Sequence, residues 1–128
     1  MDCFFASVAL LKKPEFSARP VAVSHVMDGS DHSMTQASGE ISSCNYVARS
    51  FGIRGGMWLR EARVRCPGLV VLPYDFDLIA RVAARVVALF CRAARVVEAV
   101  SVDEAYLDLG SDPDPVGTIT RLREAIER

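Results

Sequence analysis

The sequence predicts an α/β fold of the α+β kind, in which helices pack on a mixed β-sheet. Stretches typical of strands alternate with stretches typical of helices, and the last two strand-like stretches follow each other directly in the chain. No internal repeat is visible. The 128 residues, of which 51% are hydrophobic and 24% charged, suffice for one domain, or part of one, with a buried core.

Four segments are expected in the first half of the chain, in the order helix, strand, loop, and strand continuing into helix; they cover residues 6–11, 19–25, 27–39 and 40–57. Pro14 ends the first helix because proline lacks the amide hydrogen that a helix interior needs. The strand RPVAVSH alternates β-branched residues, whereas the loop is made of small, polar and flexible residues. The helix that begins near Tyr46 is broken by Gly55 and Gly56.

Five segments are expected in the second half: a short amphipathic helix, a buried strand, a long helix, a pair of strands and a last helix; they cover residues 58–66, 69–75, 77–95, 96–109 and 119–128. Pro67 and Gly68 terminate the short helix. Apolar residues of the long helix recur at helical spacing, at Ile79, Val82, Val86, Leu89 and Phe90. The pair of strands consists of two alternating runs that Asp103 and Glu104 separate.

Composition narrows the function classes. The 15 basic and 16 acidic residues give a net charge of −1, so the chain lacks the overall basic signature of many nucleic-acid-binding proteins. Four arginines cluster, which we interpret as a solvated surface: Arg54, Arg60, Arg63 and Arg65. The cysteines are too scattered for a zinc site and fit a reducing, intracellular compartment: Cys3, Cys44, Cys66 and Cys91. No apolar run reaches the roughly 18 residues of a membrane span.

Asp103 and Glu104 are neighbouring carboxylates at the expected bend between two apolar strands. Two neighbouring carboxylates repel each other and lose favourable solvation between apolar strands unless a positive charge lies between them. Hard cations such as Mg²⁺ prefer oxygen ligands of this kind, although a solvated hairpin turn would carry the same two residues. Asp2 ends an expected strand that runs into a helix, and three converging carboxylates could hold two metal ions for phosphoryl transfer.

The segment SCNYVARSFG places Tyr46 and Arg49 three residues apart, on one face of a helix. A helix start with tyrosine and arginine offers hydrogen-bond donors to phosphate oxygens, and an ordinary surface helix is the alternative. Phe4, Phe5 and Trp58 are each of a type that most often lies in the core.

Four motifs follow one another: MDCFFASV, SCNYVARSFGIRGGM, CPGLVVLPYDF and VEAVSVDEAYLDL. In this order they resemble the catalytic palm and fingers of Y-family translesion DNA polymerases, and the forms SCNY, LPYDF and CFF are most similar to the Rev1 deoxycytidyl transferase branch. The resemblance runs from Met1 to about Leu109. It implies a partial UmuC-like catalytic domain over residues 1–128, with a palm over about 1–45 and 75–128 and a small fingers insertion over about 46–74.

The resemblance also implies a role for each matched residue. Asp103 would bind Mg²⁺, Glu104 would help to place the metal ion that activates the primer 3′ hydroxyl, and Asp2 would be a third metal residue. The residues implied to lie at the incoming nucleotide are Met1, Asp2, Cys3, Phe4, Phe5, Ser43, Cys44, Asn45, Tyr46, Val47, Ala48, Arg49 and Gly55.

Within this set, Tyr46 and Arg49 would contact the triphosphate, and the Phe5 ring would lie under the sugar as a steric gate against a ribose 2′ hydroxyl. The implied reaction is transfer of a deoxynucleotide to a primer end opposite damaged template, by in-line attack on the α-phosphate with two Mg²⁺ ions. The implied partners are primer-template DNA, an incoming dNTP, which is dCTP in the Rev1 branch, and other replication or repair proteins. A nuclear location and no membrane partner are expected.

The first motif of this family reads Asp, apolar residue, Asp and an aromatic-rich run. Met1 occupies the apolar position, so Asp2 matches the second Asp and the leading metal ligand falls before residue 1. We therefore expect a chain truncated at both ends, with an incomplete metal site and no activity by itself. Two alternatives remain: a truncated product that binds nucleotide or protein without catalysis, and a phosphoacceptor receiver domain, which would need a late lysine, whereas none follows Lys13.

Overall fold

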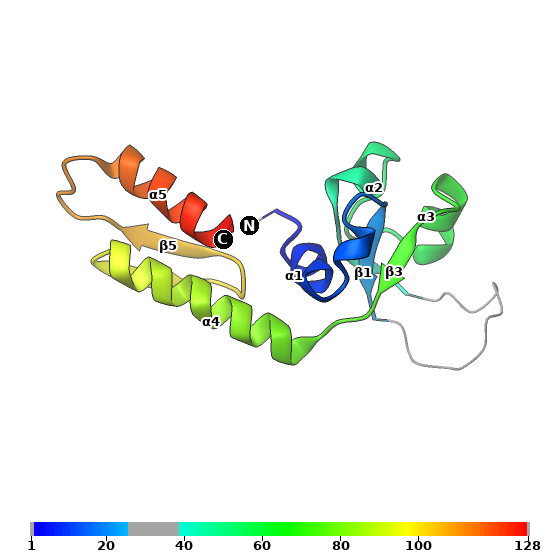
Figure 1. The fold of residues 1–128 in the computed structure, drawn as a ribbon, viewed down its shortest axis with the longest axis horizontal. Helices are drawn as coiled ribbons and strands as arrows, with labels where there is room; N and C mark the ends of the chain where they lie inside the picture. The colour runs from blue at the N-terminus through cyan, green and yellow to red at the C-terminus, as the bar shows by residue number, and fades with distance from the viewer. Residues whose placement is uncertain (1, 26–38, 128) are drawn as a thin grey trace. The chain divides into compact units, whose positions relative to one another are not determined.

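The computed structural model describes residues 2–25 and 39–127, which form two compact units. The first unit runs from Asp2 to Phe76 and the second begins at Asp77. Each unit combines helices with a small sheet (Figure 1). The predicted α/β class is therefore confirmed, while the loop predicted over residues 27–38 lies outside the described residues.

The first unit is built on a three-stranded mixed sheet. Its elements are α1 (Phe4–Lys12), the 3₁₀ turn η1 (Pro14–Phe16), β1 (Val21–Ser24), β2 (Ile41–Cys44), α2 (Tyr46–Ser50), α3 (Leu59–Arg65) and β3 (Val70–Leu72). The strand order is β2-β1-β3, with β1 antiparallel to β2 and parallel to β3. All four residues of β1 are buried. A central strand that is covered on both faces explains why this stretch is short and almost entirely apolar.

The segment after α2 returns to the outer edge of β2. Met57 O accepts a 2.8 Å hydrogen bond from Ile41 N, and Ile41 O accepts one of the same length from Gly56 N. Gly55 lies so close to this strand that an added Cβ would be 3.0 Å from the Ser42 carbonyl oxygen. The segment thereby leads α3 back over the sheet, where Leu59 joins the buried cluster that includes Ile41.

The second unit contains α4 (Phe76–Ala93), β4 (Val96–Ala99), β5 (Ala105–Asp108) and α5 (Pro115–Glu127). Phe76 itself belongs to the first unit. Strands β4 and β5 form an antiparallel ribbon in which Val97 pairs with Leu107 and Ala99 with Ala105. The apolar stripe of α4 buries Ile79 and Val86, and α5 buries Leu122. An amphipathic pattern of this kind stabilises a helix by packing more than by intrinsic propensity.

Several boundaries differ from the sequence predictions. Helix α1 begins at Phe4, two residues earlier than expected, and residues 2–3 form a turn instead of the end of a strand. Helix α5 begins at Pro115 instead of residue 119, because proline fits a first helical position and Asp114 Oδ1 accepts a hydrogen bond from Gly117 N. The Trp58 side chain is 60% exposed, so the core interpretation of this residue was wrong.

The clustered arginines of the first unit are all exposed, as interpreted from the sequence. Arg65 Nη2 lies 2.8 Å from Glu61 Oε1, one turn earlier on α3. None of the described helices combines the length and the apolar character that crossing a bilayer requires.

Candidate nucleotide and metal site

The predicted nucleotide-binding run, residues 43–49, joins β2 to α2 and exposes few side chains. Ser43, Cys44, Asn45 and Ala48 are buried and Val47 is half-buried. Tyr46 and Arg49 are the two members of the run whose side chains are exposed to solvent. A ligand at this run would therefore contact those two side chains, while the buried residues contribute to the packing of the run.

Asn45 fixes the start of α2. Its Oδ1 accepts hydrogen bonds from the backbone N–H of Ala48 at 2.9 Å and of Val21 at 3.0 Å, and its Nδ2 donates to Arg19 O at 2.8 Å. The first of these bonds is an N-cap. Because Asn45 ties α2 to both β1 and the segment before it, its observed contacts position the helix that carries Tyr46 and Arg49.

Tyr46 and Arg49 share a face of α2, as predicted. The Arg49 guanidinium lies over the Tyr46 ring, 5.0 Å from its centroid. The Tyr46 hydroxyl donates a 2.7 Å hydrogen bond to Asp2 Oδ2, which raises the pKa of this tyrosine above its ordinary value. The hydroxyl thus remains protonated at neutral pH, and three residues that the sequence assigned to one site meet within the first unit.

Cys44 and Ser43 support this site from the sheet. Burial raises the pKa of the Cys44 thiol, an effect that nearby Arg49 partly opposes, and Sγ donates to Ile53 O at 3.4 Å. Ser43 pairs with Val23 of β1. The Cys44 side chain and the strand pairing of Ser43 therefore stabilise β2, and the predicted place of both residues beside a nucleotide stays a prediction.

The start of α1 carries the other predicted nucleotide residues. Cys3 takes a left-handed conformation with φ 47°, which is unfavourable for a residue with a Cβ, and precedes α1 directly. Phe4 is buried, as expected for a core aromatic residue, whereas Phe5 is half-buried. Asp2 is exposed, and its carboxylate accepts the hydrogen bond from the Tyr46 hydroxyl. Met1, which was also predicted to lie at the nucleotide, is outside the described residues.

Asp103 and Glu104 lie at the turn between β4 and β5, which confirms their predicted place beside a bend of antiparallel strands. Asp103 is half-buried and accepts a 3.0 Å hydrogen bond from Ser101 Oγ, and Glu104 is exposed. The Glu104 carbonyl closes the turn by accepting from Val100 N at 2.9 Å. The turn therefore holds two carboxylates at one end of the ribbon.

The donor chemistry of this turn fits Mg²⁺, because both side chains offer the oxygen ligands that a hard cation prefers. Within each unit, no group of three histidine, cysteine, aspartate or glutamate side chains with metal-binding spacing occurs among the described residues. Asp2 belongs to the first unit and the pair at the turn to the second. Shared binding of one metal site by Asp2, Asp103 and Glu104 stays a prediction.

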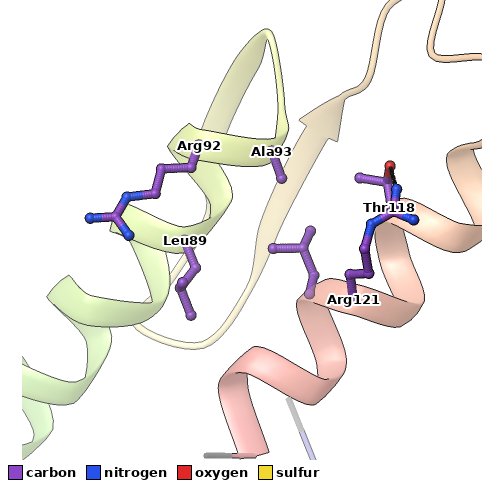
Figure 2. A pocket seen from close by; sticks show the side chains of 6 residues that line it. Leu89, Arg92, Ala93, Thr118 and Arg121 are labelled. Atoms are coloured by element: carbon purple, nitrogen blue, oxygen red, sulfur yellow. Dashed lines mark hydrogen bonds between the residues drawn. The ribbon is translucent and has the colours of Figure 1, made fainter.

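A cavity of about 380 Å³ lies between α4 and α5 of the second unit and contains no predicted site residue (Figure 2). It is lined by Leu89, Arg92, Ala93, Thr118, Arg121 and Leu122. Figure 2 shows the Arg92 guanidinium directed away from the space between the helices. The Arg121 guanidinium donates a 2.8 Å hydrogen bond to Thr118 Oγ1 and forms an ion pair with Asp114 Oδ2 at 3.5 Å. These contacts leave the cavity without an obvious charged anchor for a ligand.

The structure reveals contacts that sequence reasoning missed. Phe5 touches Tyr74, which in turn stacks on Phe76 and contacts His25. The motif LPYDF drew attention to the segment, but nothing in its spacing indicated that the Tyr74 ring contacts Phe5 of α1. The N-cap formed by Asn45 could have been predicted from the sequence, since asparagine directly before a helix is a typical N-cap.

Comparisons with known proteins place the chain in a family. The family model described as impB/mucB/samB (IMS) matches residues 1–128. The chain is 39% identical over 126 residues to the DNA polymerase IV of Shewanella denitrificans, covering 98% of this chain and 33% of the relative. It is 41% identical over 114 residues to the DNA repair protein REV1 of Arabidopsis thaliana, covering 89% of this chain and 10% of the relative. The chain thus spans a third or less of these two relatives.

Comparison of the fold with solved structures indicates the same family. A solved insertion ternary complex of Dbh DNA polymerase matches with a TM-score of 0.83 and 28% sequence identity, over 98% of this chain and 36% of that one. Coverage of 98% of the chain means that the match includes residues of both units. The chain belongs to the impB/mucB/samB family, the Y-family DNA polymerases.

Proposed function

We propose that this chain supplies the nucleotide-binding segment and two metal-binding carboxylates of a translesion DNA polymerase, which transfers a deoxynucleotide to a primer end. The observation that carries the proposal is the contact between Tyr46 and Asp2, with Arg49 on the same face of α2. It unites the first two sequence motifs at one exposed place. The names of the relatives, DNA polymerase IV and REV1, support the same reaction class.

The two exposed side chains of α2 suit a triphosphate. Arg49 is exposed, with its guanidinium over the Tyr46 ring and near the Cys44 thiol, and the five N–H donors of a guanidinium suit phosphate oxygens. The Tyr46 hydroxyl can exchange its bond to Asp2 for one to a phosphate. Both groups are hydrogen-bond donors and can therefore stabilise the negative charge of a phosphate.

Asp103 and Glu104 are the residues that would hold Mg²⁺ in this proposal. When bound, the ion would supply Lewis-acid stabilisation of the attacking and leaving oxygens. The protein's own contribution is the tight turn, in which the Glu104 carbonyl and the Ser101 hydroxyl fix the two acids at one end of the ribbon. Phe5 would exclude a 2′ hydroxyl from the sugar position.

The test uses a chimeric polymerase, in which this chain replaces the matched third of the Shewanella denitrificans DNA polymerase IV. Arg49→Ala should lower kcat/KM for dNTP about 10- to 100-fold, since a hydrogen bond to a charged group contributes about 1.5–3 kcal/mol. Arg63→Ala, which removes an exposed arginine of α3, is the matched control and should change little. Asp103→Asn should abolish primer extension. Unchanged extension by Arg49→Ala would refute the triphosphate assignment.

The finer proposal is that the parent belongs to the Rev1 branch and prefers dCTP. Its support is the 41% identity to the plant REV1 protein and the motif forms SCNY and LPYDF, while the 39% identity to a bacterial polymerase IV favours the other branch. Insertion assays with each dNTP opposite each template base distinguish the Rev1 branch from the polymerase IV branch. Preferential dCMP insertion opposite every template base supports the Rev1 branch, and template-directed insertion excludes it. A nuclear location belongs to the same proposal and can be checked by microscopy of a fluorescent fusion.

A further inference from the structure

The Phe5 ring contacts two other aromatic rings within the first unit. Its centroid lies 5.7 Å from that of Phe4 at an interplanar angle of 64°, and 5.5 Å from that of Tyr74 at 75°. Both geometries are edge-to-face, the arrangement that aromatic pairs favour. Phe4 is a core residue of α1, so its position follows from the helix. Tyr74 instead lies between β3 and α4 and has no such helical constraint.

Tyr74 is nevertheless held in place by contacts of its own. Its ring stacks on Phe76 with centroids 5.2 Å apart and planes within 3°, and lies 4.6 Å from the His25 ring. Asp75, the next residue, forms an ion pair with Lys12 at the end of α1. Lys12 follows Phe5 by seven residues, about two turns, so both project from one face of α1. One face of α1 is therefore tied to one short segment by a ring contact and an ion pair.

This arrangement matters for a steric gate, because a clash excludes a ligand only if the blocking ring cannot move away. A half-buried phenylalanine with one free side could turn to another rotamer and admit the hydroxyl. Tyr74 gives the Phe5 ring a second edge-to-face neighbour besides Phe4, and each neighbour that packs on the ring restricts its movement. We infer that Tyr74 is a positioning residue for Phe5 and thereby sets how strongly the site rejects ribonucleotides. The inference rests on the proposed function of Phe5 as the sugar gate.

The test measures the ratio of kcat/KM for dCTP to that for CTP in the chimeric polymerase. Tyr74→Ala should lower this ratio about three- to tenfold by raising kcat/KM for CTP, the size expected from the loss of one aromatic pair. Tyr74→Phe keeps the ring and should keep the ratio. Trp58→Ala removes an exposed ring outside the described ring contacts of Phe5 and Tyr74, and it should also keep the ratio.

A double variant separates positioning from general damage to the fold. If Tyr74 acts through Phe5, then Tyr74→Ala should change the ratio in the parent background but not in a Phe5→Ala background. An equal effect in both backgrounds would overturn the inference, as would a Tyr74→Ala ratio equal to that of the parent. If Phe5→Ala itself leaves the ratio unchanged, the gate assignment in the proposed function has failed, and the positioning inference falls with it.

A second measurement on the 128-residue chain does not depend on catalysis. Nuclear Overhauser effects between the ring protons of Phe5 and Tyr74 should be present in the parent chain and in Tyr74→Phe. The Phe5 ring resonances should shift in Tyr74→Ala and stay unchanged in Trp58→Ala. Absence of contact between the two rings in the folded parent chain would overturn the inference whatever the chimeric polymerase does.

Discussion

At the scale of single residues, the division of labour in the segment SCNYVAR follows from burial. Asn45 is 8% exposed, and its side chain makes three hydrogen bonds to the backbone. Tyr46, its neighbour, is 62% exposed and has one side-chain hydrogen bond, to Asp2. Adjacent residues of one motif thus serve different purposes, because the β-to-α junction turns one side chain inward and the next outward.

Replacing Asn45 with alanine should therefore lower the free energy of unfolding by about 1–3 kcal/mol. The change removes an N-cap and leaves the amide of Val21 without its partner in a buried strand. Chemical denaturation followed by circular dichroism measures the effect. Ser50→Ala on the exposed side of α2 serves as the control and should change stability by less than about 0.5 kcal/mol. A loss of similar size in both variants would contradict the stabilising role of the Asn45 side-chain hydrogen bonds.

The cysteines provide a second test at this scale. Cys91 is exposed on α4, whereas Cys44 is 2% exposed and its pKa is raised by burial. A raised pKa leaves less of the reactive thiolate at a given pH, so both effects protect Cys44 from thiol reagents. We expect Cys91 to be labelled in the folded chain and Cys44 only after unfolding, as mass spectrometry of labelled peptides can show. Rapid labelling of Cys44 in the native chain would refute the burial argument.

At the scale of elements, the sequence predicted most helices and strands and was weakest at their ends. The alternating runs around Asp103 predicted the β4–β5 ribbon and its turn, because each run has the period of a strand. The start of α5 was misplaced because its first turn depends on side-chain caps at Asp112 and Asp114 that hydrophobic periodicity does not report. The contact between Phe5 and Tyr74 joins residues 69 positions apart, and local patterns carry no information about such pairs.

The packing of α5 offers a test at the same scale. Leu122 is 8% exposed and borders the cavity between α4 and α5. Leu122→Ala should lower the free energy of unfolding by about 2 kcal/mol, the low end for a buried leucine, because one side of this residue already lacks packing. Val116→Ala, at a residue that is 76% exposed on the same helix, should have little effect. Thermal denaturation of both variants gives the comparison.

At the scale of the whole molecule, each compact unit buries apolar side chains of its own. The first contains a cluster around Ile41, Ile53 and Leu59, and the second buries Ile79, Val86 and Leu122. The candidate site is divided in the same way, with Tyr46 and Arg49 in one unit and the acidic turn in the other. Sequence order alone joined these parts through four motifs, and the family model matches residues 1–128, which include both units.

If each unit is stabilised mainly by its own core, damage to one should be local. Hydrogen exchange measured by mass spectrometry should then show that Asn45→Ala lowers protection in β1, β2 and α2, while α4 and α5 keep theirs. Leu122→Ala should show the reverse, with faster exchange in the second unit alone. The physical reason is that an amide exchanges through the least costly opening that exposes it, and a weakened core makes only its own opening less costly. Equal loss of protection throughout the chain in either variant would show instead that the two units unfold as a single cooperative structure.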